Sequence, residues 1–179
     1  MMSRRMFGFD GAHLKAEMNS YGVFLVATCK DYNKQVTLFT LAPVLVENEG
    51  HWTWFGALVK KALGSLQAFT AVSDRMKGLI KAVELSFPQA GHRYCLVHNK
   101  RNITETRKLT SGKRNLINEM AGSDCENDFY LFFSELASTN KSAADKLAKI
   151  YKTFWVKYEF LAHNKLATYG EATSNVAEQ

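Results

Sequence analysis

Two aspartates in the first half of the chain follow β-like segments and could bind a divalent metal ion. Asp10 is the polar residue of the β-like run 5–11, and Asp74 follows the short apolar segment 69–72. Mg²⁺ and Mn²⁺ prefer carboxylate oxygens as ligands. Side chains at the carboxyl ends of neighbouring strands can converge on a ligand. The sequence therefore predicts that the fold brings Asp10 and Asp74 together.

The segment around Asp74 has the pattern of a strand, an aspartate and a helix. Behind the aspartate, apolar residues recur at spacings of three and four until Pro88, which favours a helix. These residues are Met76, Leu79, Ile80, Val83 and Phe87. A second helix is predicted over residues 52–63, with Trp52 and Trp54 at its start and Gly64 as its stop. Its buried face is predicted to contain Phe55, Leu58, Val59 and Ala62.

Residues 5–46 read as three strands, with a polar segment of hairpin length at 30–34, which favours an antiparallel meander. A further β-like run covers residues 92–98. Beyond it the pattern is helical, with helices predicted near residues 124–137 and 142–162. We therefore predict an α/β fold with crossovers after an initial hairpin, followed by an all-helical second half.

The composition indicates a folded domain with a locally basic surface. Of the 179 residues, 46% are hydrophobic and 12% aromatic, which excludes a disordered chain. The net charge is +6, and residues 100–114 hold six basic residues and one acid, a density that suits a phosphate backbone. A solvated, lysine-rich surface would explain the overall charge equally well. The three scattered cysteines favour a reducing compartment. No signal peptide or membrane-spanning run is evident, so we expect a soluble intracellular protein.

Five separated segments together resemble the Mutator-like (MULE) transposase domain. The sequence DGAHLK from Asp10 is similar to a DGTHLK opening, and Glu47 to Phe55 is similar to an SWxWF helix. SDRMKGL from residue 73 resembles an SDRxKGL turn, and HRYCLVH from residue 92 an HRYCxxH strand. TSNVAE from residue 173 resembles the TNNxxES segment that carries a third acid. Ala12 in place of Thr and Gln179 in place of Ser are the departures, and neither affects a carboxylate.

The resemblance implies an RNase H-like mixed five-stranded sheet flanked by helices, with a DDE triad of Asp10, Asp74 and Glu178. The implied domains are an α/β core over 1–98, a helical insertion over 99–169, and the start of a C-terminal core helix over 170–179. We expect that helix to be truncated here, which leaves open that the chain alone is inactive. Asn175 and Glu178 also have the spacing of a helix capping box, so a capping role for Glu178 stays open.

The implied activity is DNA strand cleavage and strand transfer in cut-and-paste transposition. Two Mg²⁺ or Mn²⁺ ions about 4 Å apart can activate the attacking oxygen and stabilise the leaving one. We expect Asp10 to bridge the two ions and Asp74 and Glu178 to bind one each. The implied partner is double-stranded DNA of the transposon ends and target, with no membrane. A homo-oligomer in the active complex is left open, and the family's eukaryotic character implies a nuclear location.

Several other residues are secondary candidates. Cys95 and His98 could bind zinc, but two ligands are fewer than the usual four, and a buried structural role is the favoured alternative. The candidates for DNA binding are basic residues that follow the two aspartates or lie in the basic window: His13, Lys15, Arg75, Lys77, Lys100, Arg101, Arg107, Lys108, Lys113 and Arg114.

Two other functions stay open at this point. One is a domesticated, catalytically inactive derivative that binds DNA without cleaving it. The other is an unrelated metal-dependent nuclease on the same fold, which would keep the two aspartates but lack strand transfer.

Overall fold

A computed structural model of the chain describes residues 3–13, 22–31, 33, 35–66, 68–103 and 109–170. The described residues up to His92 form one compact unit, and those from Arg93 onward form a second. The fold is α/β, with a mixed five-stranded sheet and helices, and is compatible with an RNase H-like fold. The predicted fold class is therefore confirmed. The assignment of residues 1–98, 99–169 and 170–179 to three functional domains stays a prediction.

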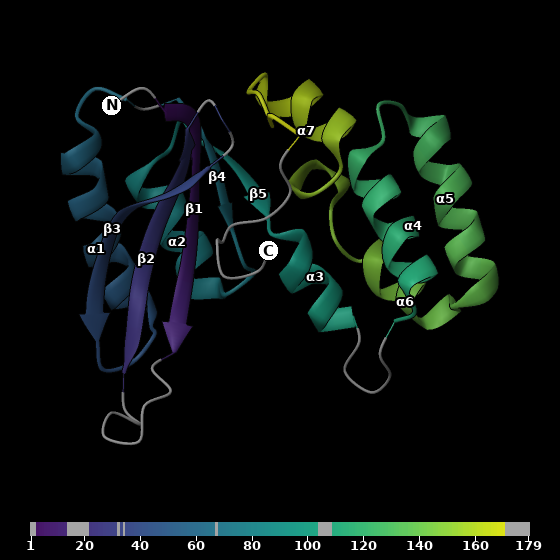
Figure 1. The fold of residues 1–179 in the computed structure, drawn as a ribbon, viewed down its shortest axis with the longest axis horizontal. Helices are drawn as coiled ribbons and strands as arrows, with labels where there is room; N and C mark the ends of the chain where they lie inside the picture. The colour runs from purple at the N-terminus through teal and green to yellow at the C-terminus, as the bar shows by residue number, and fades with distance from the viewer. Residues whose placement is uncertain are drawn as a thin grey trace. The chain divides into compact units, whose positions relative to one another are not determined.

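The first three strands form the predicted antiparallel meander. They are β1 (Ser3–His13), β2 (Val23–Asp31) and β3 (Val36–Val44), and β2 lies between the other two (Figure 1). β4 (Thr70–Ser73) pairs with the other side of β1 in parallel, and β5 (Gly91–Tyr94) follows, giving the order β3-β2-β1-β4-β5. β1 is thus the central strand, with partners of opposite direction on its two sides.

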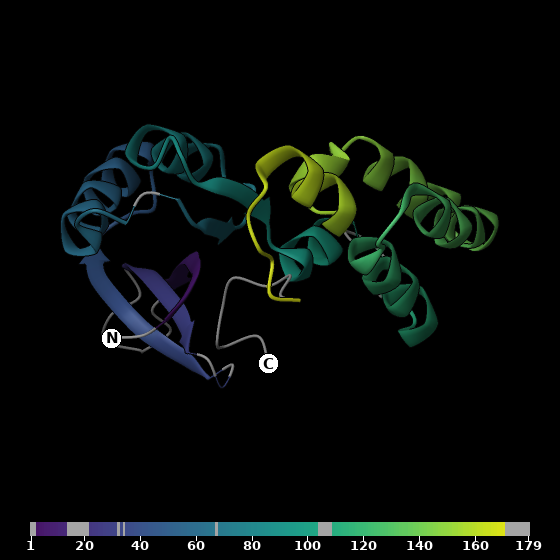
Figure 2. The same cartoon turned by 90° about the horizontal axis from the view of Figure 1, so that it is seen from above.

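Helices α1 (Glu49–Leu63) and α2 (Lys77–Ser86) cover one side of this sheet (Figure 2). Phe7 and Phe9 lie two residues apart on β1, so both point toward the core, and each is 1% exposed. They pack in one cluster with Trp52, Phe55 and other residues of the two helices. The packed layer that results supports Asp10, which lies within β1, and Asp74, which directly follows β4.

The predicted buried face of α1 is partly wrong. Phe55 and Val59 are buried, but Leu58 is 45% exposed and Ala62 is also exposed. The stripe that faces the sheet begins with Trp52 and continues through Phe55, Gly56 and Val59, so it is rotated away from Leu58. The predicted stop is confirmed, since Gly64 caps the helix with a φ of 60°.

The second unit is helical. Its elements are α3 (Leu96–Ile103), α4 (Ser111–Gly122), α5 (Glu126–Thr139), α6 (Lys141–Ala148), the 3₁₀ helix η1 (Lys152–Phe154) and α7 (Lys157–Asn164). α4 and α5 pack side by side (Figure 1). The unit has its own apolar core, which includes Ile117, Leu136, Leu147 and Trp155.

Two predicted elements of this region are wrong in extent. The β-like run 92–98 is a strand only to Tyr94, and residues from Leu96 onward form α3, which buries Leu96, Asn99 and Ile103 at helical spacing. The single helix predicted over 142–162 is interrupted between α6 and α7. Trp155 is buried at this interruption, and its indole N–H donates to the carbonyl of Ile150 at 3.4 Å.

A buried arginine also stabilises the break between α6 and α7. Arg93 Nη2 donates to the carbonyl oxygens of Trp155 at 3.1 Å and Ala121 at 3.3 Å. Burial lowers the pKa of Arg93 to about 10. Tertiary contacts therefore break this helix at a place without Pro or Gly.

Within the described part of the chain, none of the helices has the length and apolar character needed to cross a membrane.

Candidate active site

The parallel pairing of β1 and β4 brings the two predicted metal ligands together. Phe9 lies opposite Ser73 in the register of these strands. Asp10 follows Phe9, and Asp74 follows Ser73. Neighbouring strands in a sheet are about 5 Å apart. The two aspartates are therefore adjacent at the carboxyl end of β4.

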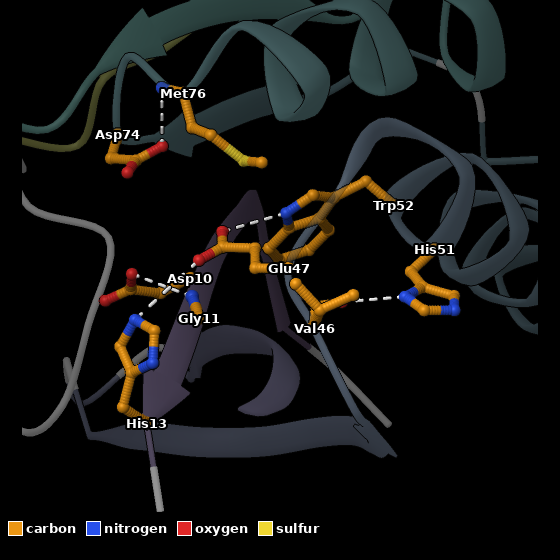
Figure 3. Close-up of polar contacts among 9 residues, drawn as sticks. All are labelled: Asp10, Gly11, His13, Val46, Glu47, His51, Trp52, Asp74 and Met76. Carbon is orange, nitrogen blue, oxygen red and sulfur yellow. Dashed lines mark hydrogen bonds and ion pairs between the residues drawn. The ribbon is translucent and has the colours of Figure 1, made fainter. Parts of the chain in front are cut away.

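Backbone amides orient both carboxylates. Asp10 is 9% exposed, and its Oδ1 accepts a hydrogen bond from the Gly11 N–H at 2.9 Å. Asp74 is half-buried, and its Oδ1 accepts from the Met76 N–H at 2.9 Å, in the turn that leads into α2 (Figure 3). Each carboxylate thus accepts a hydrogen bond from a main-chain amide one or two residues further along the chain.

His92 supports the turn of Asp74 from β5. Its Nε2 lies 2.6 Å from the hydroxyl oxygen of Ser73, and that hydroxyl donates to the carbonyl oxygen of Asp74 at 2.8 Å. A hydroxyl has one proton, so with this proton on Asp74 the imidazole is the donor to Ser73. Burial lowers the pKa of His92 to about 4. A neutral ring with its proton on Nε2 therefore fits this position.

A third carboxylate, Glu47, lies in the same region and was missed as a site residue by the sequence analysis. It precedes α1, and its Oε1 accepts a hydrogen bond from the indole N–H of Trp52 at 2.9 Å. In Figure 3 its carboxylate points toward Gly11 and His13, with the carboxylates of Asp10 and Asp74 in the same view. The distance from Glu47 Oε2 to His13 Nε2 is 4.0 Å.

Gly11 provides the space for this carboxylate. A Cβ atom at position 11 would lie 2.8 Å from Oε2 of Glu47 and 2.9 Å from its Cδ. A side chain at position 11 would therefore force the carboxylate of Glu47 to shift from its place. The signals for this arrangement in the sequence are the Gly that follows Asp10 and the spacing of five between Glu47 and Trp52.

The electrostatics of Glu47 link it to both aspartates. Burial is the largest influence and raises the pKa of Glu47; the hydrogen bond from Trp52 lowers it. The negative charge of Asp74 raises this pKa, His13 lowers it, and Asp10 raises it again, with a net shift upward. Three acids therefore influence one another in this region of the first unit.

Comparison with known families adds the identification. A sequence model of the MULE transposase domain matches residues 6–102, which is more than half of the chain. The chain belongs to the MULE transposase domain family. No curated protein matches it. The matched region contains Asp10, Glu47 and Asp74.

The donors of this MULE transposase domain suit hard divalent ions in kind, since Asp10 and Asp74 present carboxylate oxygens. Among the residues that the structure describes, no group of three or more His, Cys, Asp or Glu is placed to hold a metal ion. The predicted third ligand, Glu178, lies outside the described residues. The described part therefore contains two of the three predicted ligands.

The predicted DNA-binding residues of the domain fall in different elements. His13 is at the end of β1 with a side chain that is 69% exposed. Arg75 precedes α2, and Lys77 is its first residue. Lys100 and Arg101 belong to α3, and Lys113 and Arg114 to the first turns of α4. Lys15, Arg107 and Lys108 lie outside the described residues. Lys100 Nζ donates to the side-chain oxygen of Asn118 at 2.9 Å.

The pair of Cys95 and His98 lies at the start of α3. Cys95 is fully buried, and its carbonyl oxygen accepts the Asn99 N–H at 3.0 Å, while His98 is half-buried. In the described part of the domain, this pair belongs to no group of three or more metal-binding side chains. A zinc role for Cys95 and His98 stays a prediction.

Proposed function

We propose that this MULE transposase domain is the catalytic domain of a DDE transposase, which cleaves DNA strands and transfers them to target DNA with the help of two Mg²⁺ or Mn²⁺ ions. The observation that carries the proposal is the adjacent position of Asp10 and Asp74 on neighbouring strands in a member of this family. An RNase H-like relationship is part of the proposal, since the sheet is mixed and five-stranded.

Asp10 and Asp74, with Glu178 as the third acid, would hold the ions. When bound, such ions lower the pKa of a water and neutralise charge on a phosphate. The chain's own contribution is position. The amides of Gly11 and Met76 orient the two aspartates, and the packed sheet below them keeps the carboxylates at fixed places.

Double-stranded DNA is the proposed substrate, and the nucleus is the proposed location, because a DNA transposase of a eukaryotic family acts there. Arg75 directly follows Asp74 and Lys77 lies three residues after it, so both are near the place where a scissile phosphate would bind. The charges of Lys100, Arg101, Lys113 and Arg114 would contact the phosphate backbone elsewhere on the DNA.

The proposal is tested by nicking of supercoiled plasmid with the full chain in Mg²⁺ or Mn²⁺, with EDTA as the metal-free control. We expect Asp10→Asn and Asp74→Asn each to lower the nicking rate by at least about a hundredfold, since outer-shell partners of a metal already contribute 10- to 100-fold. Glu178→Gln tests the third acid in the same assay. Glu84→Gln, on the exposed side of α2, is the charge-matched control and should nick at the wild-type rate.

The outcomes separate the functions that were left open. Metal-dependent nicking that Asp10→Asn and Asp74→Asn abolish supports the proposal, and joining of a 3′ end to target plasmid distinguishes a transposase from a nuclease without strand transfer. DNA binding without nicking, unchanged in Asp74→Asn, would instead favour a domesticated DNA-binding derivative. Nicking that survives both substitutions would reject the proposed site.

A further inference from the structure

The segment before α1 holds Glu47 in a fixed position. The side chain of Asn48 caps the helix by accepting the His51 N–H at 2.8 Å, and His51 Nδ1 contacts the Val46 carbonyl oxygen at 2.7 Å. Trp52 is 1% exposed, and its indole N–H holds one oxygen of the Glu47 carboxylate. The main chain on both sides of Glu47 and the carboxylate itself are therefore all restrained (Figure 3).

The carboxylate rests on the main chain beside Asp10. Its second oxygen occupies the space that a Cβ atom at position 11 would need, and its side chain is only 19% exposed. Trp52 belongs to the apolar core that also fixes Phe9, the neighbour of Asp10. The same packed core therefore supports Glu47, through its hydrogen bond with Trp52, and Asp10, through its neighbour Phe9.

A structural role alone does not explain the charge of Glu47. The indole N–H of Trp52 needs one acceptor, and the neutral amide oxygen of a glutamine would provide it. A carboxylate at this place instead costs free energy, because it is half-buried and lies near two other acids. The contact with His13 at 4.0 Å and the dipole of α1 offset part of this cost. A cation bound among the three acids would offset more of it, which gives the charge of Glu47 a role at an occupied site.

We propose that Glu47 is a positioning residue of the candidate active site, whose restrained negative charge strengthens the binding of a divalent cation by Asp10 and Asp74. This inference rests on the proposed function. Because no group of three acids in the described part of the chain is placed to hold an ion, Glu47 acts through its charge rather than as a direct ligand. Trp52 and Gly11 keep that charge in place.

The test is a Mn²⁺ titration of the full chain, followed by the electron paramagnetic resonance signal of the free ion. We expect Glu47→Gln, which keeps an acceptor for Trp52 and removes the charge, to weaken Mn²⁺ binding about tenfold. Glu47→Asp restores the charge and should bind within about threefold of the wild type. The matched control is Glu49→Gln, two residues further on, where the lost carboxylate pairs with Lys81 at 2.6 Å on the surface. It should leave the affinity unchanged.

Thermal unfolding without metal separates the positioning role from a structural one. Glu47→Gln relieves repulsion and keeps the Trp52 contact, so its melting temperature should equal or exceed that of the wild type. Wild-type Mn²⁺ affinity in folded Glu47→Gln would overturn the inference, and so would a loss of the fold in this variant. Mn²⁺ binding that is absent, or that Asp10→Asn and Asp74→Asn leave intact, would instead reject the proposed metal site itself.

Discussion

At the scale of single residues, His92 connects β5 to the turn that carries Asp74. The contact through Ser73 depends on a ring that is 8% exposed and whose protonation is opposed by burial. A charged imidazole at this place would lose hydration, and this loss lowers the pKa of the ring. The turn of Asp74 is therefore best supported when His92 is neutral.

This gives a prediction for stability against pH. The pKa of His92 falls from 6.5 to about 4 in the folded state, so the unfolded chain takes up a proton first as the pH falls. The contribution of His92 is fully present above pH 6.5 and is lost between pH 6.5 and 4, with a total of about 3 kcal/mol. Urea unfolding at a series of pH values between 4 and 7.5 measures this loss.

The matched control for this measurement is His163→Gln, at an exposed position of α7, which should reproduce the wild-type pH dependence. His92→Gln should lower the slope of stability against pH in the same window. An unchanged slope in His92→Gln would mean that other groups cause the loss of stability.

The adjacent positions of Asp10 and Asp74 could be predicted from the sequence, because Asp10 is the polar residue of a β-like run, Asp74 follows another such run, and neighbouring strands can bring such side chains together. Glu47 could not be recognised in the same way. An acid just before a helix is common, since it interacts favourably with the helix dipole. Only the packing of α1 against the sheet places this acid beside Gly11, where its charge lies near two aspartates.

At the scale of elements, α1 and α2 meet closely at their first turns. The contact is made by Gly78, where an added Cβ atom would lie 2.9 Å from the main-chain N and Cα of Glu49. Main-chain atoms within a helix cannot move aside singly, so a side chain at position 78 would push the two helices apart. Glu47 lies in the segment directly before α1, and Asp74 lies in the segment directly before α2.

We predict that Gly78→Ala destabilises the fold by about 1–3 kcal/mol, the usual cost of overpacking. The matched helical control is Gly112→Ala in α4, where an added Cβ would have no neighbour within 4 Å. That variant should be as stable as the wild type or more stable, because alanine favours the helix over glycine and nothing obstructs the added methyl group. Urea unfolding compares the two, and equal stabilities of both variants would contradict the close contact at Gly78.

The element boundaries that were predicted wrongly lie where the local apolar pattern is ambiguous or where contacts between distant residues determine the structure. Local periodicity predicted the strand, the aspartate and the helix around Asp74, where each element has an apolar face and a clear stop. It failed at Leu96, because an apolar residue at this position fits a buried strand and a buried helix face equally well. It also failed at Trp155, where burial of the indole ring and the hydrogen bond from Arg93 interrupt the helix. Such long-range contacts leave no local signal in the sequence.

At the scale of the whole molecule, the charge is unevenly distributed along the chain. The net charge is +6, while residues 100–114 alone hold six basic residues and one acid. Two of these, Lys113 and Arg114, lie in the first turn of α4, in the second unit. If DNA binding depends on the basic residues of this window, removing them should weaken DNA binding more than removing the same number of positive charges elsewhere.

We predict that the double variant Lys113→Ala, Arg114→Ala weakens binding to any duplex sequence and lowers the slope of log affinity against log salt by up to about 2, because each phosphate contact contributes about 0.9. The matched control is Lys60→Ala, Lys61→Ala in the last turn of α1, which removes the same charge from exposed positions. Fluorescence anisotropy with a labelled duplex at several salt concentrations measures both slopes. A control slope close to that of the wild type would locate a phosphate contact on α4, because a general effect of net charge would reduce both slopes alike. Equal slopes for the two double variants would instead show that the basic window acts only as a part of the total charge.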